Sequence, residues 1–464
     1  MFQSKSASTP ETLFFIGGLT DMDLASNQSV KNTLKYLSQF GYLIHFFSAF
    51  PEDYRILQNP QEALGGRVVF HRTPRFLTPL YDFIKFLKDI LGMRRKKNSR
   101  KKINPAEKIR YFDEYNLMGR LFYIAFFLFY VPVEMIRVSF YYFQLKPQLF
   151  YGLNGQGTAL ASFLGKLYRK PTIQRWHGSF YTEEDVKKIQ TRWIDKFLAL
   201  DGGFSKWLPS DAVIITNDGT QGDKVFRMIG VPPEKIHFWM NGMDLEGMSL
   251  PPDWDTQRFK EGLSLSGKKI VMMASRLVLW KRVDRGLDCL YRLVNDYGMD
   301  DVVLLILGQG QEDEPLQALT KALNLEPYVR FLGAVPHPQM AKYYSIADVF
   351  LNLYDVSNLS NPLLEAMCCG PPIVTLDDGS TAGLLQEGVN AFLVPHEKLE
   401  TDLPLRVRDL LTDASLRRRI QENAKKSFHE KVLSWRERML LEHELLQGFM
   451  PKQKKVVSEA QVLV

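Results

Sequence analysis

The segment from Leu351 to Val374 contains the richest candidate site for chemistry in this sequence. A predicted strand leads there into a loop, and Asn361 and Pro362 follow as the expected N-cap and first residue of a helix. Backbone amides beside a helix N-terminus attract anions, because free N–H groups and the helix dipole both favour negative charge. The sequence therefore predicts an anion site at this turn.

Glu365 lies in the first turn of the same predicted helix or just after it. A carboxylate at this position can compensate the helix dipole and have no further role. It can also accept a hydrogen bond from a ribose hydroxyl, as an acidic residue does in dinucleotide-binding folds. Both interpretations stay open on the sequence alone.

Two cations follow another predicted strand and precede the helix expected over 283–296. Arg276 and Lys281 would lie at the C-terminal edge of a parallel sheet, which is where such sheets bind ligands. Together they can neutralise a diphosphate, Arg through its two-pronged guanidinium and Lys as a point charge. The alternative is that they are two ordinary surface cations near a loop.

Glycines and one histidine mark the ends of other predicted strands. Gly308 and Gly310 form a Gly-x-Gly pair, which is weak evidence for a ligand because it also suits a tight turn between strand and helix. Gly17 and Gly18 allow the backbone to approach a ligand or a neighbouring helix closely. His177 ends a strand at the ligand-binding edge of a sheet, so it is a candidate for the site.

Short apolar runs alternate with amphipathic helical patterns along almost the whole chain, and this alternation predicts parallel sheets covered on both faces. The predicted strands are 12–16, 43–47, 67–71, 148–152, 172–176, 212–216, 236–240, 269–274, 302–307, 329–332, 349–353, 372–376 and 391–394. The helical patterns between them include 27–40, 158–168, 283–296 and 315–323. Two such series predict two doubly wound α/β domains.

We expect the first domain to span residues 1–244 and the second 245–430, because the aperiodic stretch 248–255 contains Pro251-Pro252 and reads as a linker. A helix over 431–450 and a tail over 451–464 would follow. The length of 464 residues, with 45% hydrophobic and 24% charged residues, excludes disorder on a large scale. Three cysteines and no CxxC motif favour a reducing, cytoplasmic setting without a metal site.

An insertion over about 72–145 interrupts the first domain. Residues 91–110 contain a dense run of Lys and Arg, and the apolar stretch 121–133 follows it. This stretch of 13 residues is shorter than the roughly 20 that span a membrane. Positive charge beside apolar aromatic residues is typical of a peripheral membrane anchor, which favours a protein at the inner face of a membrane. The alternative is a solvated loop.

The net charge is +7, and the excess of Lys and Arg lies in the first half of the chain. A basic half favours an anionic partner such as a membrane surface or a phosphorylated substrate. Nucleic acid is the weakest of these options, because the basic residues form no recognisable nucleic-acid-binding motif.

Taken in order, these motifs resemble the retaining family 4 glycosyltransferases of GT-B fold. The matching segments are His177-Gly178, Asn241-Gly242-Met243-Asp244, Ser275-Arg276-Leu277-Val278 with Lys281, Asn361-Pro362-Leu363-Leu364-Glu365-Ala366-Met367, and Asn390-Ala391-Phe392-Leu393-Val394. The resemblance implies two Rossmann-like domains that face a central cleft, with the C-terminal helix packed back on the first domain.

The resemblance also implies a role for each matched residue. Arg276 and Lys281 would hold the diphosphate of a nucleotide-sugar donor, Glu365 would bind its ribose, and His177 would face its sugar. The backbone amides of Asn358, Leu359, Ser360 and Asn361 would contact sugar and phosphate. The implied reaction transfers a sugar with retention, with the nucleotide sugar as co-substrate and with neither a metal ion nor another cofactor. The basic first domain and its insertion favour a lipid-linked or surface-glycan acceptor.

The sequence departs from the family pattern at one position. The family often places a Glu eight residues before its ribose-binding Glu, and that position is Ser357 here. Asp355 stands two residues earlier and is our candidate for the missing carboxylate, through a shifted loop. The departure keeps open a nucleotide-sugar-binding subunit without catalytic activity. A second alternative is a nucleotide-sugar epimerase, which shares the two-domain architecture.

Overall fold

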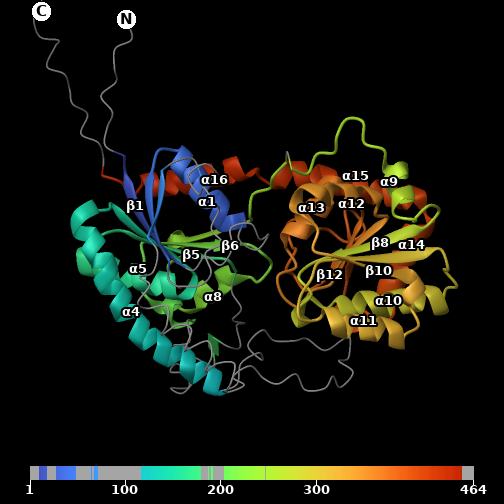
Figure 1. The fold of residues 1–464 in the computed structure, drawn as a ribbon, viewed down its shortest axis with the longest axis horizontal. Coiled ribbons are helices and arrows are strands. Elements are labelled where there is room, and N and C mark those ends of the chain that lie inside the picture. The colour runs from blue at the N-terminus through green and yellow to red at the C-terminus, as the bar shows by residue number, and fades with distance from the viewer. Residues whose placement is uncertain are drawn as a thin grey trace, which may run out of the picture.

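Two parallel β-sheets with helices packed on them form the frame of the chain (Figure 1). The computed structural model describes residues 10–17, 28–48, 64, 67–71, 117–178, 186–187, 190–191, 203–245 and 247–451. The first sheet belongs to the N-terminal half and the second to the C-terminal half, and the last helix lies beside the first sheet.

The first sheet has the strand order β3-β2-β1-β4-β5-β6-β7. Its strands are β1 (Thr12–Gly17), β2 (Leu43–Ser48), β3 (Val68–His71), β4 (Leu149–Leu153), β5 (Thr172–Trp176), β6 (Ala212–Thr216) and β7 (Ile236–Trp239). Its helices are α1 (Gln28–Gln39), α4 (Leu117–Leu145), α5 (Asn154–Tyr168) and α8 (Gly222–Met228), with 3-10 turns at Gly203–Trp207 and Pro233–Lys235. The order reverses between β1 and β4, the kind of switch point at which such sheets bind ligands.

The second sheet has the order β10-β9-β8-β11-β12-β13 and reverses between β8 and β11. Its strands are β8 (Lys269–Ala274), β9 (Val302–Leu307), β10 (Val329–Gly333), β11 (Val349–Asn352), β12 (Ile373–Leu376) and β13 (Phe392–Val394). Its helices are α9 (Thr256–Gly262), α10 (Val283–Asn295), α11 (Asp313–Ala322), α12 (Met340–Ile346), α13 (Asn361–Cys369), α14 (Asp402–Thr412) and α15 (Ala414–Lys431). Single 3-10 turns lie at Leu279–Lys281, Glu326–Tyr328, His337–Gln339 and His396–Lys398.

The apolar runs of the sequence form strands because a parallel sheet buries both of its faces. Every residue of β1 and of β9 is buried, and the side chains of alternate residues belong to different core clusters. The structure therefore confirms the predicted fold class of two Rossmann-like, doubly wound domains.

The predicted strand bounds hold for β5, β6, β8 and β9. Elsewhere they differ by one residue at one end, or at both ends for β4. Among the predicted helices, α5 differs most, because it begins at Asn154 rather than at 158, while α11 begins two residues earlier than predicted. Glycines in the first turn of α5 disfavour a helix by intrinsic propensity. Gly157 is nevertheless required there, since a Cβ would lie 2.2 Å from the backbone oxygen of Ile16 in β1.

Helix α4 contains the apolar stretch predicted at 121–133 and runs for 29 residues with Pro132 inside it. Val131 and Val138 are buried against Phe14 and Phe150 of the first sheet. Among the described residues, no helix is both long and apolar enough to cross a membrane. The basic run at 91–110 lies outside the described residues.

The C-terminal helix α16 (Trp435–Gln447) packs back on the first domain, as the resemblance implied (Figure 1). Ser434 caps it in a capping box with Glu437, and Trp435, Met439 and Leu446 join the core below the first sheet. The chain therefore crosses between the domains twice, and the crossings touch: Met243 N donates to Leu433 O, and Trp435 N donates to Met243 O.

A buried ionic cluster fixes α16 to the first sheet. Glu442 is fully buried and accepts from Arg175 of β5 and from the hydroxyl of Tyr151 of β4, and Arg438 Nη1 lies 3.3 Å from Glu442 Oε2. Burial alone would raise the pKa of Glu442, but Arg175 and Arg438 hold it below its usual value. The helix is therefore bound through an ionised carboxylate that depends on its two arginine partners.

Candidate active site

The loop between β8 and α10 carries both predicted cations, and the glycines after β9 shape it. A Cβ on Gly308, whose φ is +130°, would lie 1.8 Å from Ser275 O, and one on Gly310 would lie 2.3 Å from Leu277 O. Leu277 N donates to Gln309 O at 3.1 Å. These glycines therefore let the backbone of residues 308–310 contact the backbone of residues 275–277. Gly308 thus positions the Arg276 loop and acts on a ligand only through it.

Lys281 is buried at the end of this loop, with only 8% of its surface exposed. Its Nζ lies 3.6 Å from the ring centroid of Tyr354 and 4.5 Å from that of Trp280. Arg276 is exposed, and its Cζ lies 5.8 Å from the Trp280 ring. Burial, and then repulsion by Arg276, hold the pKa of Lys281 well below its usual value, while Asp218 opposes them. The loop thus presents a desolvated ammonium next to an exposed guanidinium.

The predicted N-cap of α13 was wrong by one residue. Ser360 is the N-cap, and its Oγ accepts from Leu363 N, while Asn361 is the first helical residue and Pro362 the second. Serine and asparagine cap helices about equally well, so propensity alone does not choose between them. Here the Asn361 side chain instead accepts, at Oδ1, from Nδ2 of Asn241 in the first domain at 3.2 Å.

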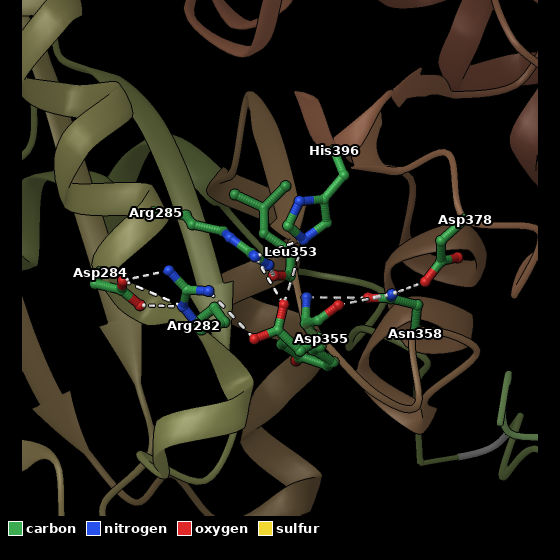
Figure 2. Close-up of polar contacts among 9 residues, drawn as sticks. Arg282, Asp284, Arg285, Leu353, Asp355, Asn358, Asp378 and His396 are labelled. Carbon is green, nitrogen blue, oxygen red and sulfur yellow. Dashed lines mark hydrogen bonds and ion pairs between the residues drawn. The ribbon is translucent and has the colours of Figure 1, made fainter. Parts of the chain in front are cut away.

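The loop before α13 keeps the free amides that an anion site needs. Among the described residues, no acceptor is paired with the backbone N–H groups of Asn358, Leu359 and Ser360. The Asn358 side chain holds the loop: its Oδ1 accepts from Tyr354 N at 3.0 Å, and its Nδ2 donates to Asp378 Oδ2 at 3.1 Å (Figure 2). Residue 358 therefore offers its amide to a ligand while its side chain is fully used within the loop.

Tyr354 links the two cations to this loop. Its ring lies under Lys281, and its hydroxyl donates to Ala274 O at 2.8 Å. Burial raises the pKa of Tyr354, and hydrogen bonds with Ser275 and Ser360 partly oppose that effect. The ammonium of Lys281 and the N-cap of α13 are therefore neighbours of one aromatic ring, so the cations and the free amides converge.

Glu365 lies one turn into α13 with its carboxylate almost buried. Its Oε2 accepts from the Tyr344 hydroxyl at 3.0 Å, and its Oε1 lies 3.3 Å from His337 Nε2. The hydrogen bond to Glu365 is the main cause that raises the pKa of His337. A carboxylate has about four acceptor positions, so both contacts leave room for a ribose hydroxyl.

Asp355 is buried among cations, so its carboxylate is not free to replace the glutamate that the family often has at position 357 (Figure 2). Its Oδ1 accepts from Arg285 at 2.7 Å and lies 3.5 Å from His396, and its Oδ2 accepts from Arg282 at 3.2 Å. Asp355 N also donates to Trp280 O. Both carboxylate oxygens are occupied by cations, so Asp355 ties the Lys281 turn to the loop before α13 and is a positioning residue.

Replacing Asp355 with alanine should lower the free energy of unfolding by about 3 kcal/mol, because it removes the carboxylate between two buried guanidinium groups. Urea unfolding of the purified chain measures this. The matched control is Asp409→Ala, which breaks a half-exposed pair with Arg408 and should cost under about 1 kcal/mol. Equal losses in the two variants would contradict the anchoring role of Asp355.

His177 ends β5 on the first domain and is neutral. Its Nδ1 lies 3.1 Å from Asn154 Oδ1, so Nδ1 carries the proton and donates it. Its Nε2 is buried and has no hydrogen-bond partner in the described part of the chain. Burial, followed by the charge of Arg175, lowers the pKa of His177 to about 3. The unpaired Nε2 is therefore a hydrogen-bond acceptor that no described residue satisfies.

The first Gly-rich turn is only partly described. A Cβ on Gly17 would lie 2.5 Å from Cβ of Leu153, so Gly17 permits close packing against the end of β4. A Cβ on Gly157 of α5 would lie 2.9 Å from Gly17 Cα, so the backbone at Gly17 approaches a neighbouring helix closely. Gly18 lies outside the described residues.

The two domains touch at the C-terminal edges of both sheets, and we call this contact the inter-domain face. Ser357 Oγ of the second domain donates to Asp218 Oδ2 of the first at 3.0 Å. A Cβ on Gly219 would lie 2.8 Å from Leu359 N. The first domain therefore approaches the free amides of the second directly.

Sequence reasoning missed three residues of this region: Asp218, Ser357 as its partner, and His337. Asp218 and His337 both follow strands, β6 and β10, and this position at the edge of a parallel sheet was the available signal. Ser357 has a φ of +67°, a backbone conformation that serine rarely adopts and that the sequence therefore does not predict. Among the described residues, no three His, Cys, Asp or Glu side chains form a group that could hold a metal ion.

Lys281 should make nucleotide binding depend on pH. A diphosphate beside the ammonium favours its charged form, so binding should raise the lowered pKa of Lys281 and take up between zero and one proton. The affinity for the nucleotide should therefore fall as the pH rises through the pKa that Lys281 has in the protein without nucleotide. Titration calorimetry of UDP and GDP at pH 8, in buffers of different ionisation enthalpy, measures the uptake. The same uptake in Lys281→Met would contradict this assignment.

Comparison with known proteins agrees with the fold. Residues 255–427, which include Arg276, Lys281 and Glu365, match the family described as Glycosyl transferases group 1. A D-inositol 3-phosphate glycosyltransferase of Jonesia denitrificans is 23% identical over 242 residues, which cover 50% of this chain and 56% of that protein.

A second relative from Campylobacter jejuni is named N-acetylgalactosamine-N,N'-diacetylbacillosaminyl-diphospho-undecaprenol 4-alpha-N-acetylgalactosaminyltransferase. It is 27% identical over 238 residues, which cover 50% of this chain and 58% of that protein. The chain therefore spans about half the length of the curated relatives it matches.

The fold extends over nearly the whole chain. HepE of Anabaena, solved in complex with UDP, superimposes with a TM-score of 0.64 at 16% identity, over 94% of this chain and 100% of that one. At this identity the likeness concerns the fold alone. Residues 255–427 thus resemble the family Glycosyl transferases group 1, and the two domains of the chain have the GT-B fold.

Proposed function

We propose that the chain is a glycosyltransferase that moves a sugar from a nucleotide diphosphate donor to an acceptor, with retention and without a metal ion. The observation that carries the proposal is the buried Lys281 ammonium beside the unpaired amides of Asn358, Leu359 and Ser360. Burying an ammonium without a salt-bridge partner is costly, and an anionic ligand at this point would remove that cost. The family match over residues 255–427 supports this choice.

The reaction breaks the bond between the sugar and the diphosphate, which leaves negative charge on the departing nucleotide and an oxocarbenium-like sugar. Arg276, Lys281 and the amides before α13 are donors that could stabilise the leaving diphosphate as its charge develops. Glu365 would accept from the ribose. This set of cations and amides can do the electrostatic work that a bound metal does in other transferases.

His177 would meet the sugar from the opposite domain. A neutral imidazole whose Nε2 is a buried, unpaired acceptor suits a hydrogen bond from a sugar hydroxyl. The C-terminal edges of both sheets would then enclose the donor, with the nucleotide on the second domain and the acceptor side on the first. Retention of configuration remains an expectation drawn from the family resemblance.

We propose a lipid-linked or surface-glycan acceptor at the cytoplasmic face of an anionic membrane. The printed name of the Campylobacter relative includes diphospho-undecaprenol. On this chain, one face of α4 exposes large apolar side chains: Leu128, Ile136, Phe140 and Phe143. An apolar groove of about 490 Å³ lies between α4 and α5, with the exposed Lys166 at its rim. Apolar residues beside basic ones give two signals for peripheral binding.

The donor is tested by thermal shift of the full chain with UDP, GDP, UDP-glucose and GDP-mannose. At least one nucleotide diphosphate should raise the melting temperature, and Arg276→Ala should weaken that shift strongly. The matched control is Arg330→Ala, an exposed arginine on β10. Product analysis with donor alone separates transfer from epimerisation, since an epimerase would convert the donor without an acceptor. No shift with any nucleotide would contradict the proposal.

The membrane contact is tested by flotation with vesicles of phosphatidylglycerol and of phosphatidylcholine. The chain should float with the anionic vesicles only. A variant with the basic residues of 94–102 neutralised, and separately Phe140→Glu with Phe143→Glu, should each reduce flotation. Unchanged flotation of both variants would contradict the membrane proposal and leave the donor proposal intact.

A further inference from the structure

The inter-domain face contains a carboxylate, that of Asp218, beside the Ser357 hydroxyl. Asp218 follows β6 in the first domain, and its Oδ1 is fixed by its own loop through Thr220 N at 3.1 Å and Thr220 Oγ1 at 2.6 Å. Its Oδ2 points to the second domain, where Ser357 Oγ donates to it at 3.0 Å. The carboxylate is therefore held rigidly by one oxygen and presents the other across the inter-domain face.

Two glycines, Gly178 and Gly219, leave the space that the Asp218 loop needs. A Cβ on Gly178, the residue after His177, would lie 2.4 Å from Asp218 Oδ2. A Cβ on Gly219 would lie 2.8 Å from Leu359 N and 3.1 Å from Asn358 N. Both glycines also have φ near +91°, which other residues adopt at a cost. Asp218 thus lies between the His177 turn and the amides expected to bind phosphate.

Charge decides which part of a nucleotide sugar can meet this carboxylate. Burial raises the pKa of Asp218, while its hydrogen bonds with Thr220 and Ser357 and the charge of Lys281 oppose that rise. Asp218 in turn raises the pKa of Lys281 against burial. A carboxylate is an acceptor only, so it repels a diphosphate and binds hydroxyl groups well. With the diphosphate at Lys281 and the loop amides, the neutral sugar is the part of the donor that Asp218 can contact.

The Ser357 hydroxyl marks where that contact forms. Ser357 donates a single neutral hydrogen bond to Oδ2, and a sugar hydroxyl can replace it or join it at a second lone pair. Ser357 also occupies the position at which the family often has a glutamate. A carboxylate is therefore present beside this position after all, although it comes from the other domain.

We propose that Asp218 is a donor-sugar-binding residue whose Oδ2 accepts a hydrogen bond from a hydroxyl of the transferred sugar. The proposal rests on the proposed function, since it needs a nucleotide sugar at this site. It assigns the sugar-contacting carboxylate to the first domain, so sugar recognition requires both domains to be in contact. The rival explanation is that Asp218 only latches the domains together through Ser357.

Titration calorimetry of the full chain with UDP and UDP-glucose, and with GDP and GDP-mannose, tests the proposal. Asp218→Asn keeps the shape of the side chain but replaces a carboxylate oxygen with an amide. We expect the affinity for the nucleotide diphosphate to change by less than threefold, and the affinity for the nucleotide sugar to fall about 10-fold or more. An unchanged preference for the nucleotide sugar would overturn the proposal.

Ser357→Ala is the matched control, because it removes the bond between the domains and leaves the carboxylate in place. It should keep the preference for the nucleotide sugar. If Ser357→Ala loses that preference as fully as Asp218→Asn does, or if both lose the nucleotide diphosphate as well, Asp218 is a latch and the proposal is wrong. If the wild-type chain binds neither UDP nor GDP, the proposed function itself is wrong. If the wild-type chain binds a nucleotide but Asp218→Asn keeps the preference for the nucleotide sugar, only the proposal for Asp218 is wrong.

Discussion

Replacing Lys281 with alanine should lower kcat/KM for sugar transfer by about 10²- to 10³-fold, the usual cost of removing one preorganised donor from a developing charge. Among the described residues, no carboxylate forms a salt bridge with the buried Lys281 side chain beside Tyr354, so its charge is available to a ligand. Its loss should act mainly on kcat, because the leaving diphosphate gains charge only as the bond breaks. Steady-state kinetics with the donor identified by thermal shift measures the effect.

Two controls separate this effect from a loss of folding. Lys321→Ala removes an exposed lysine at the end of α11 and should leave kcat/KM unchanged within about twofold. Lys281→Ala should unfold at an equal or higher urea concentration than the wild type, because it removes an unpaired buried charge. A variant that is stable and retains more than a third of the wild-type activity would contradict the role of Lys281.

Replacing Glu442 with alanine should lower the free energy of unfolding by about 3–5 kcal/mol, because it leaves Arg175 and Arg438 buried without their shared carboxylate. Glu442 lies in α16 and its arginine partner Arg175 lies in β5, so the helix should separate from the first domain before the sheets unfold. Urea unfolding followed by limited proteolysis near the C-terminus measures both effects.

Glu444→Ala is the control on the same helix. Glu444 is exposed, and its loss should change the free energy of unfolding by no more than about 0.5 kcal/mol. Glu442 also has a lowered pKa, so its stabilising effect is present above the unfolded pKa and should fade as the pH falls through the folded one. The gap between wild type and Glu442→Ala should therefore shrink under acid conditions, and a constant gap would contradict the ionic account.

The fold could be read from the sequence because its strands are buried on both faces and appear as continuous apolar runs, as in β8 and β9. The start of α5 could not be read locally, since Gly157 is present for contact with Ile16 of a different strand. The N-cap at Ser360 was missed for a similar reason, because Asn361, equally suited by type, is engaged by Asn241 from the other domain.

The sequence predicted the location of a site residue when that residue follows a strand or begins the next helix, because such positions lie at one edge of the sheet. Arg276, Lys281 and Glu365 follow strands or begin a helix, and the structure brings them toward one edge of the second sheet. Asp355 was misjudged because its buried partners, Arg282 and Arg285, belong to a different loop and helix. Asp218 was missed because its significance depends on contact between domains that are far apart in sequence.

The central claim is that a nucleotide diphosphate binds between Arg276, Lys281 and the amides of residues 358–360. A crystal structure of the chain with UDP or GDP, whichever gives the larger thermal shift, tests it most directly. The account predicts that phosphate oxygens lie within hydrogen-bond distance of the Lys281 ammonium and of at least one of those amides, with the ribose at Glu365. A nucleotide bound elsewhere, with Lys281 still packed only on Tyr354, would contradict it.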